Sequence, residues 1–102
     1  MLEIRPNCEL CDKDLPANAK DACICSYECT FCENCVDTVL ENVCPNCGGG
    51  FVLRPIRPKS TYRDNTSLKH QPASNKRIFS KYSKGEMSNF CQMIKGIPSE
   101  NR

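Results

Sequence analysis

The stretch Cys25-Ser-Tyr-Glu-Cys29-Thr-Phe-Cys32-Glu-Asn-Cys35 holds four cysteines separated by three, two and two residues. Working outward, the pair Cys8 and Cys11 lies thirteen residues before it, and the pair Cys44 and Cys47 lies eight residues after it. The chain therefore contains four close pairs of thiols. Two pairs supply the four sulfur ligands of one tetrahedral zinc ion, so the spacing predicts two closed structural Zn²⁺ sites. The predicted metal ligands are Cys8, Cys11, Cys25, Cys29, Cys32, Cys35, Cys44 and Cys47.

Composition agrees with a fold that depends on metal. The chain has 102 residues, no Trp and only seven Phe and Tyr residues, which is little material for a hydrophobic core. Chains this small usually need disulfides, a metal or a partner. The first residues contain no apolar run of signal-peptide length, and no run is long enough to cross a membrane. We therefore expect a cytoplasmic protein, without a membrane partner, in which reduced thiols bind metal.

Other uses of such a cluster remain as alternatives. The run Cys25–Cys35 has four close cysteines, as an iron–sulfur protein needs, but in the reverse order of the bacterial ferredoxin pattern. Spacing alone does not separate zinc from iron. A disulfide scaffold requires export, which the N-terminus does not indicate. A redox role for a Cys-x-x-Cys motif is typical of a βαβ context, which this sequence lacks.

Two thiols stand outside the four pairs. Cys23 precedes Cys25 by two residues, so on a strand the two would share a face. We interpret Cys23 as a buried spare thiol, although it could replace Cys25 as a ligand. Cys91 is far from the other nine cysteines, and we expect it to have no part in metal binding.

Local patterns indicate a short strand and a short helix within the cysteine-rich residues 1–53, called the head below. The residues from Cys23 to Tyr27 alternate enough for a strand. Val36, Val39, Leu40 and Val43 recur at the spacing of one helical face that begins after Cys35. The head has few other large apolar residues, so we predict a small core around the ions. Its predicted members are Leu10, Ile24, Phe31, Val36, Val39, Leu40 and Val43.

Charge divides the chain into an acidic head, residues 1–53, and a basic tail, residues 54–102. Residues 1–53 carry three basic and nine acidic side chains, whereas residues 54–102 carry eleven basic and three acidic ones. We predict a metal-binding domain over 1–53, a disordered basic linker over 54–82 and a disordered terminus over 97–102. Within 83–96, a capping-box spacing precedes a helical stripe, so this segment either forms a short amphipathic helix or stays frayed.

The four pairs in this order resemble the RING finger. Cys8-Glu-Leu-Cys11 and Cys44-Pro-Asn-Cys47 match the first and last pairs of that family. Two features depart from it: Cys29 stands where His is common, and Gly48 stands where many ubiquitin ligases have Arg or Lys. The resemblance implies a small metal-stabilised α+β fold of RING-like, treble-clef type, with two zinc ions, one short helix and a short β-hairpin.

The RING resemblance also implies a crossed assignment of ligands. In that arrangement Cys8, Cys11, Cys32 and Cys35 bind one ion, and the other four bind the second. Crossing would interlock the two halves of a head with little core. The alternative is a sequential arrangement, in which the first two pairs bind one ion and the last two pairs bind the other.

A closer likeness is to a family of short bacterial cysteine-rich proteins known only as a domain of unknown function. It is carried by residues 1–8, by Cys-Ser-Tyr-Glu-Cys-Thr-Phe-Cys at 25–32, by Cys-Pro-Asn-Cys-Gly-Gly at 44–49 and by Arg-Pro-Ile-Arg-Pro at 54–58. The likeness covers roughly residues 1–58 and implies no activity.

We expect a binding module and not an enzyme. The only His is His70, outside the head, and no catalytic set of residues can be assembled. We predict a protein partner, at a surface near Leu10, Pro45 and the helix after Cys35, and no small-molecule substrate. The basic tail, with Tyr62, Phe79 and Tyr82, makes nucleic-acid binding the alternative. A ubiquitin-ligase-like activity, implied by the RING resemblance, is a lower alternative because Gly48 departs from the ligase pattern.

Overall fold

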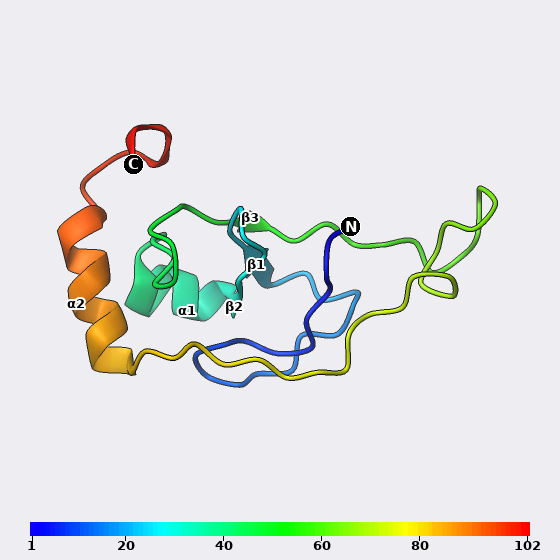
Figure 1. Cartoon of the computed structure of the whole chain (residues 1–102), viewed down its shortest axis with the longest axis horizontal. Helices are drawn as coiled ribbons and strands as arrows, with labels where there is room; N and C mark the ends of the chain where they lie inside the picture. The colour runs from blue at the N-terminus through cyan, green and yellow to red at the C-terminus, as the bar shows by residue number, and fades with distance from the viewer.

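The computed structural model describes all residues from 1 to 102 and contains a three-stranded sheet and two helices (Figure 1). Short π-helical (η1) and 3₁₀-helical (η2) turns complete the regular structure. In chain order the elements are β1 (Ala22–Ile24), β2 (Thr30–Cys32), α1 (Glu33–Cys35), η1 (Val36–Leu40), β3 (Val52–Leu53), α2 (Lys84–Ile94) and η2 (Ser99–Asn101). This content confirms a small α+β fold.

The sheet has the strand order β2-β1-β3, and both pairings are antiparallel. β1 and β2 form the expected hairpin, in which Ala22 is paired with Cys32 and Ile24 with Thr30. On the other edge of β1, Ile24 is paired with Val52. The hairpin carries cysteines on both strands and in its turn, so the sheet fixes the spacing of three predicted ligand positions.

The helix of the head begins earlier than its apolar periodicity predicts. Cys32, at the end of β2, is extended (φ −75°, ψ 153°), and α1 follows directly at Glu33. The helix then widens into the π-helical turn η1 and ends where Glu41 and Asn42 adopt left-handed φ angles of 48° and 61°. Strand and helix therefore share Cys32, which leaves no loop between them.

The core lies between the sheet, η1 and α2. Of the predicted members, Phe31, Val36, Leu40 and Val43 are buried, and Leu10, Ile24 and Val39 are only partly buried. Phe31 makes an edge-to-face contact with Phe51, with ring centroids 5.5 Å apart. Further buried residues are Ile4, Leu15 and Ala22, which the periodicity did not indicate, and Met87 and Cys91 of the stripe within 83–96.

The prediction of a disordered linker over 54–82 is wrong. The segment runs from β3 to a lobe, residues 58–71, at the far end of the molecule. It then returns beside the N-terminal residues to α2 (Figure 1). On the return, Ser74 N donates to Ile4 O (2.9 Å). Asn7 binds Ile78 twice, because its side chain donates to Ile78 O (3.0 Å) and accepts from Ile78 N (3.1 Å). Polar contacts to the head order a segment that has few apolar residues.

Arginine side chains of the tail add hydrogen bonds to backbone carbonyls. The guanidinium of Arg54 is buried and donates to the backbone carbonyls of Arg5, Leu15 and Pro16 at 2.8–3.1 Å. Arg57 donates to the carbonyls of Leu2 and Gln71.

Arg77 of the tail contacts the head through ion pairs. It forms ion pairs with Asp12 (2.6 Å) and Asp14 (2.8 Å) of the head. The basic tail therefore folds back on the acidic head at this point.

Helix α2 packs against η1 and closes the core. It begins with a complete capping box, in which Glu86 N donates to the Ser83 hydroxyl (3.2 Å) and Ser83 N donates to the Glu86 carboxylate (3.1 Å). Met87 and Cys91 face the core and are buried. The apolar stripe noted within 83–96 is thus the packed face of α2, which explains how so short a helix is stabilised.

We expect Met87→Ala to destabilise the folded protein by about 2–3 kcal/mol, because it leaves a cavity under α2. Met87 is 1% exposed, whereas Met93 on the outer face is 73% exposed and provides a matched control. Chemical denaturation of the metal-loaded variants measures both effects. Equal, small losses for the two variants would show that α2 is not docked in solution.

The C-terminal residues are also ordered, so the predicted disorder of 97–102 is wrong. η2 follows Pro98, and the side chain of Arg102 donates to Asn42 O (2.8 Å). Neither α1 nor α2 has the length and apolar character that a membrane-crossing helix requires.

Candidate metal centre

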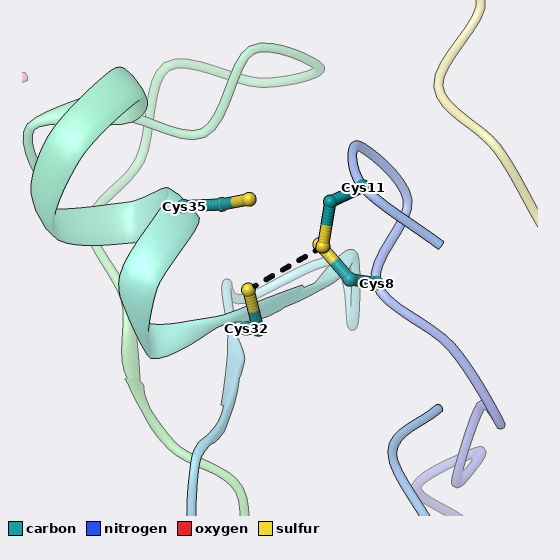
Figure 2. A group of neighbouring side chains, drawn as sticks. All are labelled: Cys8, Cys11, Cys32 and Cys35. Carbon is teal, nitrogen blue, oxygen red and sulfur yellow. Dashed lines mark hydrogen bonds between the residues drawn. The ribbon is translucent and has the colours of Figure 1, made fainter. Parts of the chain in front are cut away.

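The first group of cysteines comes from three separate places in the fold (Figure 2). Cys8 and Cys11 lie on the N-terminal loop, Cys32 ends β2 and Cys35 lies on α1. Their four sulfur atoms all lie within 4.8 Å of one another. Cys11 Sγ and Cys32 Sγ are 3.7 Å apart. We name this set centre 1.

These distances fit a tetrahedral ion. Zinc–sulfur bonds of about 2.3 Å place the sulfurs of a tetrahedral site about 3.8 Å apart, close to the separation of Cys11 and Cys32. A disulfide would bring two sulfurs to about 2.0 Å, and all ten cysteines are free. Four thiols from three segments therefore surround a volume suited to one metal ion.

The second group contains Cys25, Cys44 and Cys47, whose sulfur atoms also lie within 4.8 Å of one another. Cys25 follows β1, and the other two belong to the loop between η1 and β3. Cys29, the fourth predicted ligand, falls outside this mutual distance. It nevertheless lies near the group, because the neighbouring side chains of Cys44 and Cys25 lower the pKa of its thiol. We name the four residues centre 2.

Cys29 and Cys44 perturb each other's pKa. The neighbouring Cys44 side chain lowers the pKa of the Cys29 thiol to about 5. The neighbouring Cys29 side chain, together with burial, raises the pKa of the Cys44 thiol well above its ordinary value. Metal ions bind thiolates, so an ion in centre 2 would displace the proton of Cys44.

The grouping of thiols follows the crossed order. Cys8 and Cys11 meet Cys32 and Cys35, whereas Cys25 and Cys29 meet Cys44 and Cys47. Each centre therefore joins two pairs that lie on either side of one pair of the other centre in sequence. In the sequential order, Cys8 and Cys11 would have met Cys25 and Cys29, and the structure does not bring these two pairs together.

Backbone geometry presents the sulfurs in two similar turns. Asp12 N donates to Cys8 O (3.0 Å) and Gly48 N donates to Cys44 O (2.7 Å), so each Cys-x-x-Cys segment closes on itself. The residue after each turn has a left-handed φ, 64° at Asp12 and 82° at Gly48. Gly49 N also donates to the sulfur of Cys47 (3.4 Å).

The departure at Gly48 from the RING pattern thus has a local reason, and it gives a prediction. Gly48→Ala should destabilise the protein by about 1–2 kcal/mol, because an L-residue is strained at this φ. The effect is measured by denaturation of the metal-loaded protein, with Gly96→Ala as the control in open space. No loss at Gly48 would mean that this turn relaxes without cost.

Cys23 and Cys91 belong to neither centre. Cys23 is buried on β1, opposite Phe31 of β2, and burial raises the pKa of its thiol to about 11. Cys91 is buried on α2 and donates to Val43 O (3.3 Å). Both thiols are held in their neutral form, as expected for spare cysteines that pack in a core.

Sequence reasoning missed one residue of this region. Glu9, between Cys8 and Cys11, is 5% exposed, and burial raises the pKa of its carboxyl. Its carboxylate accepts hydrogen bonds from Thr30 N (2.7 Å), Arg5 Nη1 (3.1 Å) and Asn46 Nδ2 (3.2 Å). Acidic residues are common between zinc ligands, so nothing in the pattern distinguished Glu9 from a solvated side chain.

Comparisons with known proteins show which family the chain belongs to. No solved structure matches the chain. A relative from Rhizobium meliloti (strain 1021), described as uncharacterized protein R02474, is 54% identical over 78 residues, which cover 76% of this chain and 86% of the relative. Because the alignment is longer than residues 1–58, the likeness extends into the tail. The model of the family described as protein of unknown function (DUF1272) matches residues 1–57, so the chain belongs to this family, as its resemblance indicated.

Proposed function

We propose that the protein is a structural two-zinc module that holds a protein-binding surface in place. The observation that carries the proposal is the crossed convergence of the cysteines into two centres. Centre 1 has the four thiols of a closed structural site, and centre 2 has three thiols with Cys29 as its proposed fourth ligand. Thiolates are soft ligands that favour zinc over magnesium, calcium or manganese.

The surface proposed for the partner is a groove of about 540 Å³ beside centre 1. The head contributes Leu10 and Val39 to its walls, and the tail contributes Phe79, Tyr82 and Met87. Near Pro45, by contrast, α2 covers the head, and Pro45 is buried. The groove is thus built jointly by head and tail, and it presents apolar and aromatic groups of the kind enriched in protein interfaces.

Photo-cross-linking from two tyrosine positions tests this proposal. A photoreactive phenylalanine analogue is placed at Tyr82, in the groove, or at Tyr62, which is 82% exposed at the far lobe. We expect one discrete protein adduct from position 82 in cells, lost when Leu10→Asp is added, and none from position 62. Absence of an adduct at 82, or equal adducts at both positions, would contradict a binding groove.

Nucleic-acid binding is the second candidate, and one surface favours it. The lobe over residues 58–71 carries Lys59, Arg63 and Lys69 without carboxylate partners, beside the exposed ring of Tyr62. Unpaired cations meet phosphates, and an exposed aromatic ring can stack on a base. Elsewhere in the tail, Arg54 and Arg57 are bound to backbone carbonyls and are less available.

Salt dependence distinguishes this candidate from non-specific attraction. If the lobe binds nucleic acid, affinity for a single-stranded oligonucleotide should fall steeply with salt and be lost when Lys59, Arg63 and Lys69 are replaced by Gln. Replacement of Lys20 on the head by Gln is the control. Absence of binding at low salt would exclude the candidate.

A further inference from the structure

Glu9 occupies a central position between the two centres. It lies in the first Cys-x-x-Cys turn, between Cys8 and Cys11 of centre 1, and its side chain points into the protein with 3% of it exposed. One carboxylate oxygen, Oε2, accepts from Thr30 N and Arg5 Nη1. The other, Oε1, accepts from Asn46 Nδ2. Both oxygens of a buried anion are therefore used.

Two of the partners of Glu9 lie beside or between ligands of centre 2. Asn46 lies between Cys44 and Cys47, in the last Cys-x-x-Cys turn. Thr30 follows Cys29 directly and is fully buried. Backbone bonds reinforce the link, because Glu9 N also donates to Thr30 O (3.0 Å). One side chain from centre 1 thus fixes two segments that carry ligands of centre 2.

We propose that Glu9 is a positioning residue that couples metal binding at the two centres, so that an ion in one centre raises the affinity of the other. This inference rests on the proposed function, since it requires both centres to bind metal. An ion in centre 1 fixes the Cys8–Cys11 turn and with it the Glu9 carboxylate. The carboxylate then holds Asn46 and Thr30 in place, so centre 2 is already partly ordered before its ion binds. Binding of the second ion therefore costs less conformational entropy. Linkage requires the converse effect to be equal.

The tail takes part in the same network. Ser80 donates from its hydroxyl to Asn46 Oδ1 (2.8 Å) and from its backbone N to Glu9 O (3.3 Å). Asn46 is therefore held from both ends of its amide, by Glu9 and by Ser80. Tests of coupling consequently use the full chain.

The test compares two asparagines in equivalent places. Asn46→Ala removes the link between Glu9 and centre 2. Asn34→Ala changes the same position of another Cys-x-x-Cys segment, Cys32–Cys35. Both asparagines are exposed, but the Asn34 side chain takes no part in the network, whereas that of Asn46 binds Glu9 and Ser80. Thiol-reduced, metal-free protein is titrated with Zn²⁺, and native mass spectrometry measures the fractions with zero, one and two ions.

Independent, equal sites give about half of the chains one ion at half saturation, and unequal sites give more. We expect the wild type and Asn34→Ala to stay well below that level, and Asn46→Ala to reach it or exceed it. Glu9→Gln, which keeps the shape but removes the charge, should shift the distribution in the same direction. The Glu9→Gln variant provides a second measurement of the coupling if Asn46→Ala binds no metal.

Two results would overturn the coupling. One is a wild type in which half or more of the chains hold a single ion at half saturation. The other is a pair of variants, Asn46→Ala and Glu9→Gln, with the distribution of the wild type. Either result leaves the two-zinc proposal intact, whereas failure of the wild type to bind two ions would contradict the proposed function itself.

Discussion

Cys32→Ser is expected to remove metal from centre 1 and to abolish the cooperative fold of the head. Cys32 is 2% exposed, ends β2 and precedes α1, so its sulfur fixes the point where strand and helix meet. A structural zinc site contributes on the order of 10 kcal/mol of apparent binding free energy. A core this small supplies only about 3–5 kcal/mol, so it cannot compensate for the loss of an ion. Elemental analysis and circular dichroism of the purified variant measure metal content and structure.

Cys23→Ser is the matched control for this prediction. Cys23 is equally buried on the neighbouring strand but belongs to neither centre. Its variant should keep the metal content of the wild type and lose about 1–2 kcal/mol, the cost of burying a hydroxyl group. A Cys32→Ser protein that retains full metal content and a cooperative transition would contradict the assignment of Cys32 to centre 1.

Arg54→Met is expected to destabilise the protein by about 3–5 kcal/mol, although it lies outside both centres. The guanidinium satisfies three backbone carbonyls beneath the N-terminal loop, and residue 54 is 4% exposed. Methionine fills much of the volume but leaves these acceptors without donors, at a cost of about 1–3 kcal/mol each when buried. Denaturant titration of the metal-loaded variant measures the loss.

The control for Arg54 is Arg63→Met, in the exposed part of the far lobe. That variant removes the same charge without a buried contact, so its stability should change by less than about 0.5 kcal/mol. Limited proteolysis adds a local reading, because release of Arg54 should expose the segment from 54 to 82 to cleavage. Equal stabilities for the two variants would show that the tail is not anchored by Arg54.

The parts of the fold that the sequence predicted depend on short-range patterns. Alternation from Cys23 to Tyr27 indicated a strand, and β1 contains only the first two of these residues, because the chain turns after Ile24. The recurrence of Val36 and Leu40 indicated a helix, because both side chains face one core. Its start at Glu33 was missed, since Glu33 and Asn34 are exposed and add nothing to the apolar pattern.

The order of the tail could not be predicted from its composition. Disorder is inferred when a segment lacks apolar side chains to bury. Here the ordering contacts are polar and connect residues far apart in sequence, as Asn7 with Ile78 and Arg77 with Asp12. A pairing of this kind depends on the three-dimensional path of the chain. Neither partner residue lies in a local sequence pattern that predicts the pairing.

The candidate site, like the fold, was predicted where it depends on local spacing and missed where it depends on contacts between distant residues. The spacing of cysteines predicted eight ligands, and seven of these thiols gather into two groups. Spacing did not reveal that Cys29 lies outside the mutual distance of the other three thiols of centre 2. Nor did it reveal Glu9, whose role follows from contacts to Thr30 and Asn46, 21 and 37 residues away in sequence.

The most direct test of the two-zinc account is the metal content of the purified full chain, measured by elemental mass spectrometry. Circular dichroism before and after chelation accompanies it. We predict about two zinc ions per chain, one for each group of thiols, and loss of structure when the metal is removed. Iron with a visible absorption band would contradict the assignment of zinc. A folded chain without metal, with its cysteines oxidised to disulfides, would contradict the account as a whole.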